Sequence, residues 1–155
     1  MYIFRITRTQ YANDLTGNGA RLYGGRWNSE GRFALYSAST RALALLETLA
    51  HTSLALLKEG DFALVTLEVP DTVAHEAITA NSLPRGWNAW NLMRHTRKLG
   101  DAFLQQGSHL LLRVPSVLLP EEHNWVLNPL HPAMKQVHVA HIRPLQLDNR
   151  LLTAV

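Results

Sequence analysis

The stretch of sequence that decides the fold runs from Phe33 to Val69 and reads FALYSASTRALALLETLAHTSLALLKEGDFALVTLEV. Residues 33–37 predict a short strand, because apolar and aromatic side chains precede a run of small hydroxyl residues. Residues 62–69 predict a longer strand that ends at a proline. The segment between them has the leucine spacing of a helix. The stretch therefore predicts a strand, a helix and a strand in succession.

The predicted helix spans residues 40–58, with Ser39 or Thr40 as its N-cap and Gly60 after its end. At about 100° per residue, one stripe of side chains falls along one face of this helix. The stripe consists of Leu43, Leu46, Ala50, Leu54 and Leu57, and it is widened by Leu45, Leu49 and Leu56. We expect this face to pack on the core.

The segments on either side complete a short list of elements. Further strands are expected at 2–7, 109–114, 124–127 and within 136–147, and a second helix at 89–106. Residues 12–32 are rich in Gly, Asn and Arg and predict a long ordered loop, of a length at which loops tend to be functional. Strands and helices do not alternate regularly, so we expect a single α+β domain over residues 1–155 with a mostly antiparallel or mixed sheet.

Composition bounds the class of protein. A chain of 155 residues fits one domain. It contains no cysteine, which excludes disulfides and thiolate metal sites. No run of about 18 apolar residues could span a membrane, and the N-terminus lacks the layout of a signal peptide. We therefore expect a cytoplasmic protein without a membrane partner.

The charge is concentrated in two places. The first 32 residues carry five arginines against two carboxylates, which equals the whole formal charge of +3. The second basic cluster consists of Arg85, Arg94, Arg97 and Lys98. Local positive fields of this kind suit a phosphate-bearing ligand, whereas a nucleic-acid site usually has a longer basic stripe. A solvated surface is the alternative, and we favour it for Arg8, Arg32 and Arg85.

Glu47 is the first candidate for chemistry. It is the only carboxylate between Glu30 and Glu59, and it falls at the edge of the leucine stripe of the predicted helix. A carboxylate on a core-facing edge loses water and needs hydrogen-bond donors. The alternative is a boundary residue that pairs with His51 one turn further on. The helical pattern alone leaves both interpretations open.

Residues 24–28 read GGRWN and form the second candidate. Two glycines allow positive φ and a close approach of backbone to a ligand, and the planar guanidinium of Arg26 can bind two phosphate oxygens at once. Trp27 fits the core better than a pocket wall. A tight turn with a surface arginine is the alternative. Further glycines and an arginine just upstream strengthen the ligand-binding interpretation, namely Gly17, Gly19 and Arg21.

Tyr36 lies on the predicted strand of residues 33–37 and Ser116 follows another strand, and both could line the same site. The phenol of Tyr36 could stack on a flat ring or form a hydrogen bond in a pocket, with ordinary strand packing as the alternative. Ser116 follows a strand ending in Val-Pro. A nucleophilic serine would need a visible base or a nucleophile-elbow motif, so Ser116 is better suited to orienting a ligand or Glu47.

Asn128 opens the rigid loop of residues 128–132, which reads NPLHP. This loop could edge a site, although a structural turn is the better interpretation. The eight histidines raise the question of a metal. His138 and His141 are three apart on a predicted strand and so point to opposite faces. We therefore expect no metal site.

Six short motifs in this order resemble the RES domain, a family named for its arginine, glutamate and serine. The motifs are GGRWN at 24–28, LYSA at 35–38, ALLE at 44–47, VPS at 114–116, NPLHP at 128–132 and DNRL at 148–151. The resemblance extends from Phe4 to Leu151. One departure is Phe103, where the family pattern has tryptophan; the change affects packing more than chemistry.

The resemblance implies a toxin of a bacterial toxin–antitoxin pair, with a fold similar to that of ADP-ribosyltransferase toxins. Such proteins deplete NAD+ by hydrolysis or phosphorolysis, and some relatives ADP-ribosylate a host enzyme. The implied partner is an antitoxin with an Xre-type helix-turn-helix that blocks the active site. No cofactor is implied, because NAD+ is the substrate. Carried over, the arginine is Arg26, the glutamate Glu47, the serine Ser116 and the pocket tyrosine Tyr36.

A single carboxylate suffices for this chemistry. The nicotinamide of NAD+ leaves as a neutral molecule, so no second carboxyl group has to protonate it, as an ordinary glycoside requires. We therefore expect Glu47 to face Arg26 across a cavity sized for a dinucleotide. The candidate substrate-binding residues around them are Tyr36, Gly25, Arg5, Arg21 and Asn128. The alternatives are ADP-ribosylation of a protein and, more remotely, a non-catalytic basic module that binds nucleic acid.

Overall fold

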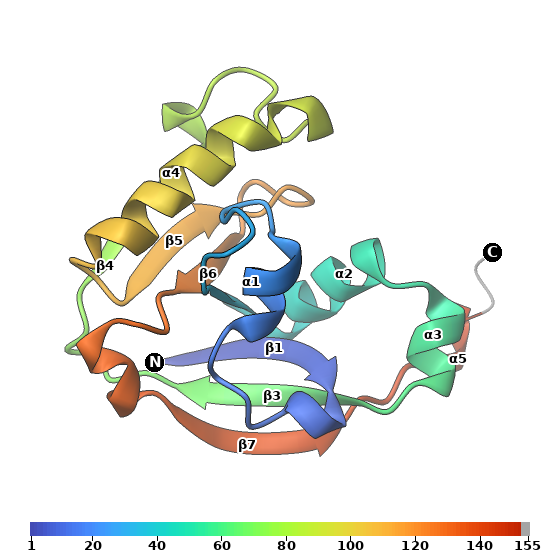
Figure 1. Cartoon of the computed structure of the whole chain (residues 1–155). Coiled ribbons are helices and arrows are strands. Elements are labelled where there is room, and N and C mark those ends of the chain that lie inside the picture. Colours follow the sequence, from blue (N-terminus) through green and yellow to red (C-terminus); the bar gives the residue numbers. More distant parts are fainter. Residues whose placement is uncertain (153–155) are drawn as a thin grey trace.

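The computed structural model describes residues 1–152 and contains one seven-stranded sheet (Figure 1). The strands are β1 (Tyr2–Arg8), β2 (Leu35–Ala38), β3 (Phe62–Glu68), β4 (His75–Ala77), β5 (Leu111–Pro115), β6 (His123–Leu127) and β7 (His138–Pro144). Their spatial order is β4-β5-β6-β2-β1-β3-β7, and all neighbours are antiparallel except the parallel pair β4–β5. The expected α+β class with a mixed sheet is confirmed.

Five α-helices accompany the sheet in the described part of the chain. They are α1 (Asn18–Tyr23), α2 (Arg41–His51), α3 (Leu54–Glu59), α4 (Met93–Gln106) and α5 (Asn149–Leu152). Short 3₁₀ turns lie at Thr9–Tyr11, Ala80–Ser82, Trp90–Leu92 and Pro132–Gln136. Within residues 1–152, every helix is too short or too polar to cross a bilayer.

The single helix predicted over residues 40–58 is wrong, because the chain forms α2 and α3 with a break between them. Each helix has its own cap: Thr40 Oγ1 accepts a hydrogen bond from the N–H of Leu43, and Ser53 Oγ accepts one from Leu56. A serine at a helix start satisfies N–H groups that would otherwise lack a partner. The leucine stripe is therefore not continuous, and Leu56 is 43% exposed.

Two other local predictions need correction. The loop predicted at residues 12–32 contains α1, which starts at Gly17 with a φ of 70°. Low helix propensity of the Gly- and Asn-rich sequence concealed this short helix. The strand predicted at residues 33–37 is observed as β2, which spans Leu35–Ala38. The sequence analysis did not predict β4, whose three residues are all exposed and show no apolar alternation.

The two faces of the sheet carry different layers, since side chains alternate along each strand. One face holds a core cluster that includes Ile3, Val65 and Leu127. The other face is covered in two parts. α2 packs its buried residues against β1 and β3, and Phe103 of α4 packs with residues of β5 and β6. The two parts meet over β2 and β6, where the functional candidates lie.

Gly100 lets α4 approach the segment of residues 24–28. A Cβ at this position would overlap the carbonyl group of Trp27. Glycine lowers helix propensity, so on its own it would weaken the middle of α4. The structure shows instead why this position requires glycine.

We predict that Gly100→Ala lowers the free energy of unfolding by about 1–3 kcal/mol, the usual cost of overpacking. The clash outweighs the gain in helix propensity of up to about 1 kcal/mol that alanine brings. Urea denaturation measures the change. Gly19→Ala is the matched control, because a Cβ there meets no atom within 4 Å. Equal stability of Gly100→Ala and the wild type would contradict the close contact.

Candidate functional site

Glu47 is held by one of its two carboxylate oxygens. Ser116 Oγ donates a hydrogen bond to Oε1 at 2.8 Å, and Asn124 Nδ2 donates to the same oxygen at 2.6 Å. No donor among the described residues forms a hydrogen bond with Oε2. The carboxylate is therefore fixed through Oε1, and Oε2 remains open to a ligand. The hydrogen bonds that hold Glu47 come from Ser116 and Asn124, and not from His51 as the alternative interpretation required.

Ser116 is a fixed donor to Glu47. It is 1% exposed and follows β5 directly. Its hydroxyl oxygen accepts hydrogen bonds from the backbone N–H groups of Leu118 and Leu119, at 3.1 and 3.2 Å. Because these bonds occupy both lone pairs, the single hydroxyl proton is directed at Glu47. Ser116 thus connects α2 to the turn between β5 and β6.

Asn124 is the second donor, and the sequence analysis missed it. It lies in β6 opposite Ala38 of β2 and Val114 of β5. Its position in the strand places it on the same face as Val126, which is buried under α4. A polar side chain at an inward position of an apolar strand is the signal that could have identified it.

The segment of residues 24–28, here called the glycine–arginine turn, requires glycine twice for different reasons. Gly24 has a φ of 67°, which glycine adopts without strain. Gly25 has ordinary φ, but a Cβ there would lie 2.6 Å from the hydroxyl oxygen of Tyr36. The N–H of Gly25 also donates to the carbonyl of Asn28 at 2.9 Å. The turn is therefore closed on itself and pressed against β2.

Tyr36 holds the glycine–arginine turn from below. Its hydroxyl donates to Asn28 Oδ1 at 2.7 Å and accepts from the N–H of Trp27 at 3.0 Å. Burial raises the pKa of Tyr36, and the bond from Trp27 opposes this only in part. The phenol is thus a neutral structural contact of the turn. Trp27 is buried, as expected from its sequence context.

Arg26 lies within electrostatic range of Glu47. Burial lowers the pKa of Arg26, and the negative charge of Glu47 acts in the opposite direction. The guanidinium donates to the carbonyls of Trp87 and Asn88, each at 3.3 Å. Both distances exceed the normal range for such bonds, so phosphate oxygens could replace these acceptors at low cost. The acid and the arginine-bearing turn lie on the same side of the molecule.

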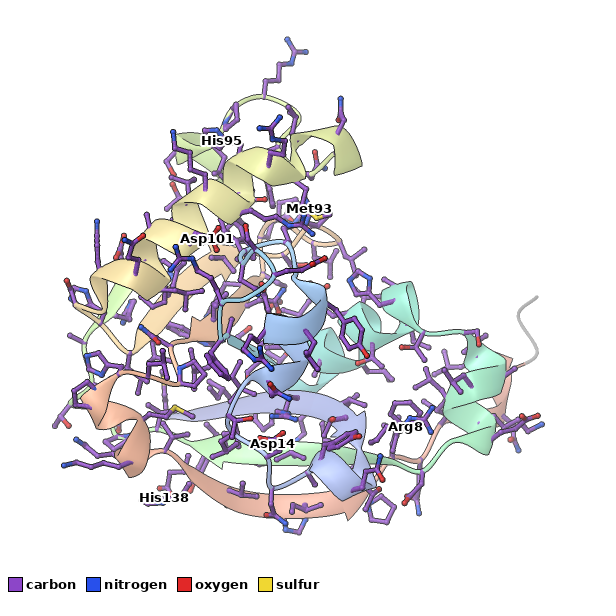
Figure 2. All side chains as sticks on the ribbon, in the orientation of Figure 1. Arg8, Asp14, Met93, His95, Asp101 and His138 are labelled. Atoms are coloured by element: carbon purple, nitrogen blue, oxygen red, sulfur yellow. The ribbon has the colours of Figure 1, made fainter. Side chains whose placement is uncertain are left out.

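α4 clamps the glycine–arginine turn from the other side. Arg97 Nε donates to the carbonyl of Gly25 at 2.7 Å. Just after the turn, the N–H and hydroxyl of Ser29 both donate to the carboxylate of Asp101, at 2.9 and 2.6 Å. Figure 2 labels Asp101 on the stretch of α4 next to this segment. Arg97 belongs to the second basic cluster, whose charge suits a phosphate-bearing ligand. Its contact with the glycine–arginine turn was not predicted from the sequence.

Arg5 and Arg21 make local contacts away from Glu47. Arg5 alternates with Phe4 along β1, so it points to the sheet face opposite α2. Its guanidinium donates to backbone carbonyls of the following loop, including that of Asp14 at 2.8 Å. Arg21 donates to Asn18 Oδ1 and lies over the ring of Phe33. The structure therefore does not bring either arginine to the carboxylate.

Asn128 also stays apart from Glu47. It is 2% exposed and lies just after β6, four residues beyond Asn124 and so about 13 Å along the chain. Its amide donates to the carbonyl of Leu104 and its side-chain oxygen accepts from the N–H of Leu130. These bonds are those of a structural turn.

Two hollows lie outside the carboxylate site. One has a volume of about 440 Å³ and lies against α4; the other, of about 220 Å³, lies near His109 and His131. Neither is lined by Glu47 or Arg26, so the cavity expected between these two residues stays a prediction. Among residues 1–152, no group of three histidine or carboxylate side chains is arranged to hold a metal ion.

Comparison with known proteins identifies the family and the fold. The sequence model of the RES domain family matches residues 2–148 of this chain. A Sphingobium sp. protein named "Prs ADP-ribosylating toxin" is 42% identical over 147 residues, which cover 94% of this chain and 91% of the relative. "Toxin Res" of Photorhabdus laumondii is 34% identical and aligns over 99% of both chains. A structure of the M. tuberculosis MbcT–MbcA toxin–antitoxin complex matches with a TM-score of 0.78 at 20% identity, over 94% of this chain and 84% of that chain.

The fold is thus the α+β, ADP-ribosyltransferase-like fold that the sequence analysis expected. The chain belongs to the RES-domain family of toxins. Two of the residues that the resemblance implied for the site, Glu47 and Ser116, are in direct contact in the structure.

We predict that Tyr36→Phe lowers the free energy of unfolding by about 1–3 kcal/mol, because it leaves the Trp27 N–H and Asn28 Oδ1 without their partner. Chemical denaturation gives the difference. Tyr23→Phe is the control, since Tyr23 is 79% exposed on α1. An equal effect of both substitutions would show that the phenol does not hold the turn.

Proposed function

We propose that this chain cleaves the nicotinamide–ribose bond of NAD+, as a glycohydrolase or a phosphorylase. The observation that carries the proposal is the carboxylate of Glu47, anchored through Oε1, open at Oε2 and within electrostatic range of Arg26. The "Toxin Res" relatives and the family match support a toxic activity of this kind.

The reaction needs one negative charge at the sugar. When the bond between C1′ of the ribose and the nicotinamide nitrogen breaks, its electron pair goes to the nitrogen, and nicotinamide leaves neutral. The ribose becomes an oxocarbenium ion, which the free Oε2 of Glu47 stabilises. Water or phosphate then forms the new bond to C1′ and gives up a proton. A fixed charge in a site with little water can lower the barrier by about 3–4 kcal/mol.

Arg26 supplies the binding half of the site. Its guanidinium exchanges the long bonds to the carbonyls of Trp87 and Asn88 for the diphosphate of NAD+. Tyr36 keeps the glycine–arginine turn in place through its hydroxyl. Ser116 and Asn124 position Glu47 without touching the reacting atoms.

A second candidate function is ADP-ribosylation of a protein. One observation favours it: the relative that is 42% identical bears the name "Prs ADP-ribosylating toxin". Both functions use the same bond cleavage at Glu47 and differ in the acceptor that attacks C1′. Labelled NAD+ incubated with purified protein, with and without phosphate, and with cell lysate separates them by mass. Free ADP-ribose or its phosphate supports the first function, and a labelled protein band supports the second.

An antitoxin is the proposed protein partner. The structural neighbour was determined in a toxin–antitoxin complex, which supports a partner of this type. An Xre-type helix-turn-helix in that partner and its placement over Glu47 are further parts of the proposal. Neutralisation of growth arrest by co-expression of an adjacent antitoxin gene tests it.

We predict that Glu47→Gln reduces nicotinamide release by at least about 10²-fold, because the charge that stabilises the oxocarbenium ion is lost. The variant remains folded, since glutamine keeps an acceptor oxygen for Ser116 and Asn124. Chromatography of released nicotinamide measures the rate. Glu59→Gln, an exposed position on α3, is the control. Near-normal turnover by Glu47→Gln rules out the proposed role, and salt-sensitive nucleic-acid binding without nicotinamide release would favour a non-catalytic module.

We predict that Asn124→Ala lowers kcat for NAD+ cleavage by about tenfold or more with little change in KM, because Glu47 loses one of the two bonds that fix it. Ser116→Ala has an effect of the same kind. Steady-state kinetics on proteins of verified fold give both constants. A change confined to KM would place Asn124 in substrate binding, and unchanged kcat would deny it any positioning role.

A further inference from the structure

The hollow against α4 is lined by three cationic side chains and one carboxylate. Its volume is about 440 Å³, within the range of small-molecule sites. The lining residues are Ser29, Arg94, Arg97, Lys98, Asp101, Ala102 and Gln105. Neither Glu47 nor Arg26 is among them, so the hollow is distinct from the carboxylate site. It contains most of the second basic cluster, for which the proposed reaction has no use.

Two of the three cations of this hollow lack hydrogen-bond and ion-pair partners among the described residues. Among the described residues, neither Arg94 nor Lys98 forms a hydrogen bond or ion pair, and Arg97 uses only its Nε. Arg94 lies three positions before Arg97 and four before Lys98 on α4, spacings at which like charges repel. The first turn of the helix has no acidic residue to offset them. The arrangement lowers the stability of α4 unless an anion is present.

The one carboxylate in the hollow is already occupied. Asp101 accepts both hydrogen bonds from Ser29, and Arg32 lies 3.8 Å from it. Its charge is therefore directed toward the loop and toward Arg32 rather than toward the three cations. The open side of the hollow keeps a net positive charge, with two guanidinium groups and one ammonium group available as donors.

We propose that this hollow binds a diphosphate group. Two guanidinium forks and an ammonium group offer more donors than a single carboxylate can use, and they match the many oxygens of linked phosphates. The space exceeds that of one phosphate. A ligand in the hollow would also contact residues that hold the glycine–arginine turn. Arg97 donates to the carbonyl of Gly25, and Ser29 follows the turn directly.

The diphosphate has two possible sources. It is either the diphosphate of NAD+ itself, in which case the cations of α4 and not Arg26 hold that group, or that of a separate molecule that binds behind the turn and leaves Arg26 free to hold the diphosphate of NAD+. The first source rests on the proposed function, and the second does not. In both cases the same cations of α4 recognise the same chemical group.

Calorimetric titration of inorganic pyrophosphate into the full chain tests the proposal. We expect saturable binding that weakens by about tenfold or more in the double variant Arg94→Ala, Lys98→Ala, since two charged contacts are lost. The control double variant is Lys135→Ala, Arg143→Ala. It has the same change in charge, and Arg143 lies on β7, at the edge of the sheet remote from α4 (Figure 1). Binding by the control stays within about twofold of the wild type.

Absence of pyrophosphate binding, or an equal loss in both double variants, overturns the proposal. Repeating the titration on Glu47→Gln with saturating NAD+ separates the two sources. Competition identifies the diphosphate of NAD+ as the occupant, and unchanged pyrophosphate binding identifies a separate molecule. If NAD+ fails to bind this variant and the wild type alike, the proposed function fails, while the pyrophosphate result on the hollow stands by itself.

Discussion

The two hydrogen bonds that join Oε1 of Glu47 to Ser116 and Asn124 are the contacts on which the candidate site depends. A carboxylate that loses part of its water needs hydrogen-bond donors in exchange. Here one donor directly follows β5 and the other lies in β6, whereas the acid comes from α2. The bonds therefore fix the helix relative to the strands, and they leave one oxygen free. One oxygen of Glu47 thus stabilises the fold, and the other is available for the proposed chemistry.

The other half of the site is the glycine–arginine turn, whose position depends on close packing against Tyr36 and α4 rather than on charge. The glycine–arginine turn lies between Tyr36 below and α4 beside it. Gly25 and Gly100 each leave room that a Cβ would fill, on the side of Tyr36 and of Trp27 respectively. Arg97 closes the arrangement by holding the Gly25 carbonyl. Arg26 is thus presented from a rigid turn, which lowers the entropy lost when a phosphate-bearing ligand binds.

Much of this could be predicted from the sequence, for physical reasons that particular residues illustrate. Strong apolar patterns located β3 and α4 closely. A lone acid on a leucine-rich helix made Glu47 a candidate, and its catalytic role was implied only by the resemblance to the RES domain. The break between α2 and α3 at Ser53 could not be predicted, because the leucine spacing of one helix continues through it. The hydrogen bond by which Ser53 caps α3 is a local contact that this spacing does not reveal. The roles of Arg5, Arg21 and Asn128 in substrate binding stay predictions, and their observed contacts are with backbone and neighbouring side chains. Asn124 was missed because its importance arises only when β6 is placed beside α2.

The central claim is that the free oxygen of Glu47 and the guanidinium of Arg26 hold the nicotinamide ribose and the diphosphate of one dinucleotide. The most direct measurement is a crystal structure of the protein with an NAD+ analogue whose nicotinamide–ribose bond cannot be cleaved. We predict that C1′ of the ribose lies against Oε2 of Glu47, with Oε1 still bonded to Ser116 and Asn124, and that Arg26 contacts the diphosphate. An analogue bound elsewhere, or bound with its ribose away from Glu47, would contradict the claim.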